Sequence, residues 1–495
     1  MILCLIVFIF ALFLRLYFAY KKDTFHIDES LSVAISANSG YMWGKPLPNG
    51  EFFGKELKGI AYWHDRSFAD AISDIKGLWK NNQWDLDHPN LYYILYRLWH
   101  IGVQTGDFEW IKQRGIGLNL VFFTCGFIFA FFLAHRLFGF NFLVPLFLAL
   151  AFFNSASVSN TIFIREYTLQ EALALLFILN LLLFFQNPRR GFWFLVYFAF
   201  CTALFLLSGY FTLFFVLPCV MVLLCVYFRN ALKIIFATAL SFGFCKIFYQ
   251  SYFLGLDQGG RSKQALDKLQ LQVFFENLQK SFDALIDILH THLINIFMLV
   301  LLVLLCSLLL CKYKILKKYL NRNLAFTLGV FIFSILWICG ILYLAPYKTL
   351  RYIMPIFPFL FLGVCVGILL LSYRIPKISV LLSLCFVGSL FYHYKLDTLK
   401  KSLPDSIFSQ VKTPVVVHLP NWNWQWAYFL YQLNDLQLYT IESDKNKLKT
   451  AIADKSRFYL ISSNGLPLEN IEIIEQKSGS NGIDIFLLQN KNTTQ

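Results

Sequence analysis

Two adjacent carboxylates, Asp28 and Glu29, follow the first long apolar run of the chain. Residues 1–20 are apolar except for Arg15, and at ~1.5 Å per residue such a run can cross most of a bilayer. The acids would then lie at the membrane–water boundary, where a carboxylate could serve as a base for a substrate anchored in lipid. His26 could hydrogen-bond to either acid. Alternatively, Asp28 could cap a helix that begins at Glu29.

A second polar element lies further along, where Asp85, Asp87 and His88 precede Pro89 at the start of an amphipathic helix. These side chains could bind substrate, or they could cap the helix. They could also hold a divalent cation, but a single His is weak support for a metal. The 11 Cys residues lie in apolar runs, which argues against a Cys metal site. We therefore predict no cofactor and no metal.

Cations that could bind a phosphate recur along the chain. A guanidinium can pair with a phosphate through two hydrogen bonds, and an intramembrane charge needs a polar partner or cavity. The alternative is a boundary cation whose charge reaches the interface. The candidates at the starts of apolar runs are Arg165, Lys348 and Arg351, and those within runs are Arg15 and Lys246.

The high hydrophobic content of the chain is typical of a membrane protein. Of the 495 residues, 58% are hydrophobic, which is more than a soluble protein buries. The N-terminal run lacks a charged n-region and a cleavage site, so we expect a retained helix. Apolar runs of roughly 17–25 residues predict about eleven transmembrane helices, at 2–19, 115–134, 141–158, 167–186, 191–207, 210–228, 232–254, 286–311, 324–345, 352–372 and 377–393.

The short basic loops that give the net charge of +14 fall on one side of these spans, which the positive-inside rule makes the cytoplasm. The charge is therefore no sign of nucleic acid. The apolar segment 89–103 is too short to cross the membrane. We therefore predict that it forms an interfacial helix within a large first extracytoplasmic loop, 21–114. Residues 394–495 contain strand-length runs at 414–418, 458–462 and 483–489, with a helix-compatible piece at 444–454.

The predicted fold class is thus an all-α polytopic membrane protein with a small C-terminal α/β domain. We expect a membrane domain over 1–393 and a periplasmic domain over 394–495.

Four elements in order carry a family resemblance. They are the Asp28-Glu29 pair, Asp-His-Pro-x-Leu-Tyr-Tyr at 87–93, Arg-x-Tyr-x-Leu at 165–169 and Arg-Tyr-x-x-Pro-x-x-Pro at 351–358. Over roughly residues 1–395 the chain resembles the membrane glycosyltransferases of C-type fold related to protein O-mannosyltransferases and lipid A aminoarabinose transferase, which are family-39-like. Many relatives have His-Pro-Pro where this chain has His-Pro-Asn, and an acid where it has Leu86.

The resemblance implies transfer of a sugar from a polyprenyl-phosphate donor to an acceptor hydroxyl or phosphate on the periplasmic face of a bacterial inner membrane. It assigns Asp28 as the base, His88 and Pro89 to the element that closes the first loop, and Arg165 and Tyr167 to the motif of the second outer loop. We expect His26, Asp85, Asp87, His88 and Tyr167 to bind substrate. We expect an inverting reaction in which Glu29 steers the base and the basic residues named above hold the phosphate. The rival interpretations are a transporter or flippase for a lipid-linked or charged substrate, and a catalytically inactive scaffold.

The topology can be tested directly. If residues 89–103 lie at the outer interface, a reporter fused after Gly106 is periplasmic, whereas one fused after Arg190 is cytoplasmic. Alkaline phosphatase and green fluorescent protein fusions at both positions measure this. A cytoplasmic signal after Gly106 would contradict the eleven-span topology.

Overall fold

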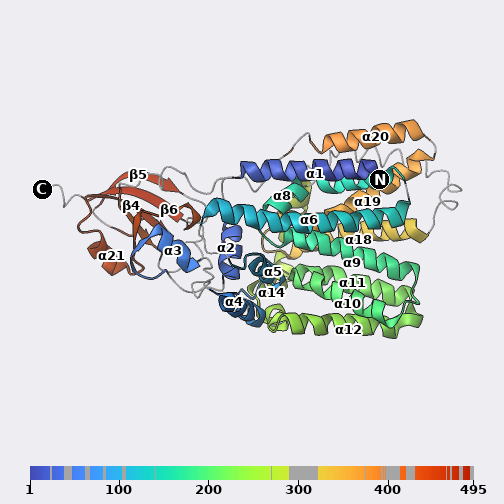
Figure 1. Ribbon diagram of the computed structural model, residues 1–495, viewed down its shortest axis with the longest axis horizontal. Coiled ribbons are helices and arrows are strands. Elements are labelled where there is room, and N and C mark those ends of the chain that lie inside the picture. Colours follow the sequence, from blue (N-terminus) through green and yellow to red (C-terminus); the bar gives the residue numbers. More distant parts are fainter. Residues whose placement is uncertain are drawn as a thin grey trace. The chain divides into compact units, whose positions relative to one another are not determined.

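In a computed structural model, the helices and strands of the chain group into two compact units (Figure 1). Unit 1 comprises Met1–Lys21, Leu86–Tyr92 and Ile116–Asp397, and unit 2 comprises Lys22–Asp85, Tyr93–Gly115 and Thr398–Gln495. The structure describes residues 1–22, 25–37, 47–61, 67–81, 85–102, 107–139, 141–268, 270–288, 322–373, 375–391, 394, 396, 413–419, 430–463, 465–468, 471–478 and 483–490.

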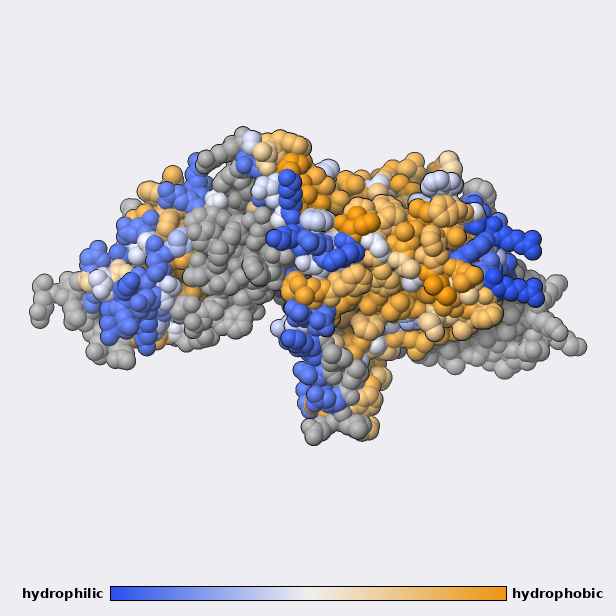
Figure 2. All heavy atoms as spheres, turned by 90° about the horizontal axis from the view of Figure 1, so that it is seen from below, coloured by the Kyte–Doolittle hydropathy of each residue, from blue (hydrophilic) through white to orange (hydrophobic). Residues whose placement is uncertain are grey.

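Unit 1 is helical, and its surface in Figure 2 is largely apolar, with hydrophilic residues gathered at the right-hand end. Its helices are α1 (Ile2–Lys21), α6 (Phe108–Phe138, whose first turns belong to unit 2), α7 (Leu143–Phe153), α8 (Ser155–Ile162), α9 (Tyr167–Gln186), α10 (Phe192–Leu207), α11 (Leu213–Val226), α12 (Ala231–Phe248), α13 (Tyr252–Gln258), α14 (Gly260–Asp267), α15 (Leu271–Ile288), α18 (Arg322–Leu344), α19 (Phe357–Ser372) and α20 (Pro376–Ser389).

Among the described residues, six helices are long and apolar enough to cross a membrane, and a seventh span results if the bent pair α7–α8 is counted as one. α10, α20 and the segment Tyr210–Val226 are shorter apolar helices. Each predicted span other than 286–311 overlaps one of these elements. Residues 289–311 of that prediction lie outside the described residues. The multi-pass architecture is therefore confirmed, whereas the count of eleven is not.

Several basic loops share one end of unit 1. Asn323 Nδ2 donates to Arg136 O at 3.1 Å, and Gln186 Nε2 donates to Asn323 Oδ1 at 3.1 Å. The Tyr227 hydroxyl donates to Phe185 O at 2.7 Å. These bonds join the ends of α6, α9 and α11 to the start of α18, as the alternation of basic loops predicts.

The span predicted at 141–158 is not a straight helix, because α7 and α8 meet at Asn154 with a bend of 56°. The Asn154 amide donates to Leu150 O and Ala151 O at the end of α7, and its Oδ1 accepts from Ser157 N at the start of α8. One side chain thus satisfies backbone groups of both helix ends, which an apolar surrounding would leave unpaired.

Arg15 lies at this break and is fully buried. Its guanidinium donates to Thr161 Oγ1 at 2.9 Å, Ser157 Oγ at 2.8 Å and Phe152 O at 3.0 Å. Ser157 Oγ in turn donates to Glu171 Oε1 at 3.1 Å. The buried cation therefore stabilises the polar face of α8 and faces a buried carboxylate through Ser157.

Unit 2 contains a six-stranded sheet in the order β1-β3-β2-β4-β6-β5. β2 pairs in parallel with β3 and β4, and the other pairings are antiparallel. α21 (Lys445–Ala451) contributes Leu448 to a core with Val416, Phe458 and Leu460. The strands are β1 (Gly50–Phe53), β2 (Val415–His418), β3 (Leu438–Ile441), β4 (Arg457–Ser463), β5 (Glu472–Ser478) and β6 (Ile483–Gln489). The three strands and the helix predicted for this region are confirmed.

The edge strand β1 comes from the first loop, which also contributes α2 (Ile27–Ser36), α3 (Gly54–Ala61) and α4 (Phe68–Asn81) to unit 2. The contacts thus group most of this loop with the C-terminal region, and the predicted bounds 1–393 and 394–495 remain a prediction. α5 (Leu91–Trp99) is 9 residues long. At ~1.5 Å per residue it is about 14 Å, too short for a span.

Replacing Arg15 tests the buried network. Arg15→Met leaves Glu171 and the polar face of α8 without a cation, which we expect to cost about 3–5 kcal/mol of unfolding free energy. Thermal unfolding in detergent measures the loss. Glu171→Gln in the same chain should recover part of it, because no buried charge then remains. Normal stability with weakened donor binding would instead make Arg15 a phosphate ligand.

Candidate functional site

A cavity of about 630 Å³ lies in unit 1, at the end opposite the shared basic loops. The start of α9, the end of α10 and the end of α18 meet around it, whereas their other ends are near the basic loops. Its walls are largely apolar, with Phe205, Phe214 and Trp337 among them. The lining also includes the polar residues Asp87, His88 and Gln170, so the cavity suits a molecule that is part apolar and part polar.

Three of the four sequence elements line this cavity. Asp87 and His88 come from the segment before α5, and Glu166 and Tyr167 come from the start of α9. The fourth element, at residues 351–358, forms two 3-10 turns, η5 (Leu350–Tyr352) and η6 (Met354–Ile356), before α19 begins. The residues that it contributes to the wall are Tyr352, Pro355 and Ile356.

Arg165 connects two of these elements. Its side chain is 3% exposed. Its Nη2 lies 3.4 Å from His88 Nε2, and its Nε lies 3.4 Å from Glu166 Oε2. A guanidinium can only donate, so in this contact His88 Nε2 is the acceptor. The carboxylate of Glu166 partly neutralises the buried charge of Arg165. Arg165 therefore supports the cavity wall in addition to being a candidate ligand of the donor phosphate.

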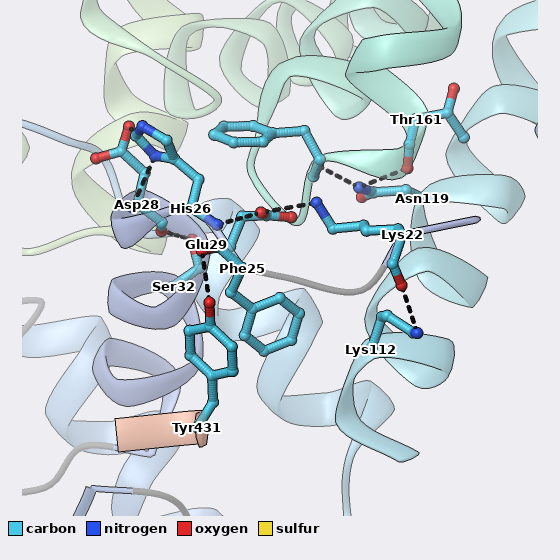
Figure 3. Close-up of polar contacts among 11 residues, drawn as sticks. Lys22, Phe25, His26, Asp28, Glu29, Ser32, Lys112, Asn119, Thr161 and Tyr431 are labelled. Atoms are coloured by element: carbon cyan, nitrogen blue, oxygen red, sulfur yellow. Dashed lines mark hydrogen bonds and ion pairs between the residues drawn. The ribbon is translucent and has the colours of Figure 1, made fainter. Parts of the chain in front are cut away.

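Asn119 of α6 also connects two elements, and the sequence analysis missed it. It is fully buried. Its amide donates to Thr161 O at 3.2 Å and to Phe163 O at 2.7 Å (Figure 3), and its Oδ1 accepts from the Tyr92 hydroxyl at 3.3 Å. Asn119 therefore fixes the chain just before Arg165. The sequence did contain a signal for this role, because Asn119 is a polar residue inside a predicted apolar span.

Gly255 of α13 packs against the wall of the same cavity. A Cβ there would lie 2.6 Å from Leu86 O and 2.0 Å from the Tyr210 hydroxyl oxygen. Tyr210 lines the cavity and donates to Tyr252 O at 3.2 Å. A side chain at 255 would displace backbone next to Asp87, so this close approach requires glycine.

Lys348 forms hydrogen bonds near the end of α18. Its Nζ donates to Leu342 O at 2.8 Å and to Ser281 Oγ at 2.9 Å, and Lys268 Nζ donates to Ala345 O nearby. Partial burial, together with the charge of Lys268, lowers the pKa of Lys348 to about 8. Two cations at a helix C-terminus satisfy carbonyl groups that the helix leaves open. The structure thus gives Lys348 a capping role beside any role in phosphate binding.

Lys246 was expected in the middle of a span, and that expectation is wrong. α12 ends at Phe248, so Lys246 is in its last turn, where it is exposed and donates to Gln250 O at 2.5 Å. The apolar residues beyond Phe248 that extended the predicted span belong partly to α13. The Nζ of Lys246 thus binds the backbone of the segment that follows α12. Arg351 is half-buried on η5, immediately before Tyr352.

The acidic pair lies in the first turn of α2 in unit 2, and its two members differ (Figure 3). Glu29 is fully buried, pairs with Lys22 Nζ at 2.9 Å and accepts from His26 N at 2.7 Å. The N-cap is His26, not Asp28 as one alternative from the sequence had it, because His26 Nδ1 accepts from Asp28 N at 3.2 Å. The Asp28 side chain is 21% exposed, with an oxygen 3.5 Å from His26 Nδ1.

Neighbouring contacts in unit 2 hold this turn. Lys112 Nζ donates to Lys22 O at 2.6 Å and pairs with Glu109 at 2.7 Å. Asp85 is buried and accepts from the Tyr93 hydroxyl at 3.3 Å. Glu29 is therefore built into the framework, while Asp28 is the carboxylate of the pair that reaches solvent. Among the described residues, no group of His, Cys, Asp and Glu has the arrangement of a metal site.

Comparison with known proteins gives a likeness of fold. No protein-family model and no curated protein matches the sequence. A crystal structure of ArnT from Cupriavidus metallidurans bound to undecaprenyl phosphate is 11% identical, with a TM-score of 0.50 over 98% of this chain and 97% of that chain. The apo state of that ArnT gives a TM-score of 0.43 at 11% identity, over 81% of this chain and 88% of that chain. The resemblance to the aminoarabinose transferase group is thus confirmed as a resemblance of fold.

Proposed function

We propose that this chain is a glycosyltransferase that moves a sugar from a polyprenyl-phosphate donor to an acceptor hydroxyl or phosphate on the periplasmic face. The observation that carries the proposal is the cavity of about 630 Å³ on which three separated sequence elements meet. The ArnT structure of similar fold was solved with undecaprenyl phosphate, which supports a lipid-phosphate donor here.

The lining of the cavity fits such a donor. Phe205, Phe211 and Leu344 offer apolar surface for isoprene units, and Asp87 and Gln170 offer hydrogen-bonding groups for a sugar. Because an isoprenoid in the bilayer is already out of water, aromatic and aliphatic side chains would hold it through van der Waals packing. The polar lining groups would then fix the orientation of the head group.

Arg351 is the residue that we propose as the main ligand of the donor phosphate. Arg15, Lys246 and Lys348 are the other candidate phosphate ligands from the sequence. Arg165 faces Glu166 and His88 and would assist. Arg351 lies on η5, the same 3-10 turn as Tyr352, which lines the cavity.

Asp28 is the proposed base. As the acceptor attacks the anomeric carbon, its proton must go to a group within hydrogen-bond reach, and a partly exposed carboxylate can accept it. The leaving group is already a phosphate, so it needs a cation rather than a general acid. Glu29, buried against Lys22, would position the base, and His26, Asp85 and Tyr167 would contact substrate. Attack opposite the phosphate inverts the anomeric centre.

We further propose the eleven-span topology, with the cavity facing the periplasm. Its support is the shared end of the basic loops, opposite the cavity, and the positive-inside rule. Purified protein in detergent should transfer label from a polyprenyl-phosphate sugar to an acceptor. Facilitated movement of the lipid across vesicles without transfer would favour the flippase instead.

The first variant tests the base. Asp28→Asn keeps the shape of the side chain but cannot take the acceptor proton, so we expect turnover to fall by ~10²–10⁴-fold with donor affinity largely kept. Glu29→Gln is the matched control, and it should act mainly by destabilising α2 because Lys22 loses its partner. Normal turnover in Asp28→Asn together with an inactive, folded Glu29→Gln would move the role to Glu29.

The second variant tests the phosphate site. Loss of a charge-assisted pair costs ~1.5–3 kcal/mol, or roughly 10–150-fold in donor affinity. We expect this for Arg351→Ala, with partial recovery in Arg351→Lys because Lys cannot form two parallel bonds. Undecaprenyl phosphate binding to the purified variants measures it. Unchanged binding and turnover in folded Arg351→Ala would remove Arg351 from the site and direct attention to Arg165.

A further inference from the structure

The C-terminal region contacts the segment that carries Asp28. The Tyr431 hydroxyl on η10 (Leu430–Gln432) donates to Phe25 O at 3.3 Å, and the two rings lie 5.3 Å apart (Figure 3). Phe25 is 1% exposed and Tyr431 is 5% exposed. Gln432 Nε2 donates to the same hydroxyl at 2.8 Å, which orients its proton away from Gln432.

Phe25 immediately precedes the capping box of α2. His26 supplies the N-cap side chain and the backbone N–H that Glu29 accepts, so the position of the Phe25–His26 peptide sets where the first turn begins. Asp28 is in that turn. A shift of Phe25 O would therefore move the carboxylate, and a displacement of ~1 Å can cost up to ~100-fold in rate.

Further contacts attach the same C-terminal segment to the first loop. β1 pairs with β3, with Gly50 opposite Ile441. Lys58 Nζ pairs with Asp435 at 2.9 Å. A Cβ on Gly54 would lie 2.2 Å from Asn434 O, so the two backbones approach as closely as glycine allows. The segment that carries Tyr431 is thus held against the first loop independently of the tyrosine.

We propose that Tyr431 is a positioning residue for Asp28: its hydroxyl and ring hold the Phe25 peptide, and through it the first turn of α2, in the geometry needed for catalysis. This inference rests on the proposed role of Asp28. It makes Tyr431, in the C-terminal region, a working part of the transferase.

Tyr431→Phe in the full chain tests the proposal, because it removes the hydroxyl and keeps the ring against Phe25. We expect kcat to fall roughly 3- to 30-fold with KM for the donor unchanged. In an Asp28→Asn background the same change should have no further effect, because a residue that acts through Asp28 is not additive with it. Tyr459→Phe is the matched control: it removes the hydroxyl of another largely buried tyrosine, on β4, and its kcat should equal that of the parent.

Hydrogen exchange gives a readout that needs no activity. Amides of residues 27–33 should exchange faster in Tyr431→Phe than in Tyr459→Phe. An unchanged kcat and unchanged exchange in Tyr431→Phe, with Asp28→Asn inactive, would overturn the positioning role alone. Full activity of Asp28→Asn would overturn the base itself, and additive losses in the double variant would show that Tyr431 acts elsewhere.

Discussion

The buried guanidinium of Arg15 is the interaction on which the helical unit depends. An apolar bundle in a membrane has no water to satisfy a broken helix, so every polar group at the break needs a protein partner. Arg15 and Asn154 supply those partners at the junction of α7 and α8. Because the junction is stable, α8 can end where the chain turns toward Arg165 and the cavity.

From that break, a short series of buried bonds leads to the cavity. Asn119 holds the backbone after α8 and accepts from Tyr92, so two elements far apart in sequence share one support. Arg165 then joins His88 to Glu166 in the cavity wall. Residues that look like independent motifs in the sequence are therefore parts of one network. Loss of a supporting residue should alter several lining residues at once.

The sequence predicted what depends on local pattern. The apolar runs and the strands of the C-terminal region followed from periodicity and spacing, whereas the meeting of three motifs at one cavity was not predicted. Long-range partners did not follow from them. Arg15 was a candidate phosphate ligand because its partners on α8 lie more than a hundred residues away. The pairing of β1 with β3 joins residues 50–53 to 438–441, and no local signal marks residues 50–53 as a strand.

Locating undecaprenyl phosphate in the bound protein tests the central claim most directly. Cryo-electron microscopy of the purified chain with this lipid should show the isoprenoid against Phe205, Phe211 and Leu344, with the phosphate near Arg351. Charge-removing Arg351→Ala should weaken that density, whereas Arg190→Ala at the basic end should not. Lipid bound only outside the cavity, or an empty cavity at saturating lipid, would contradict the account.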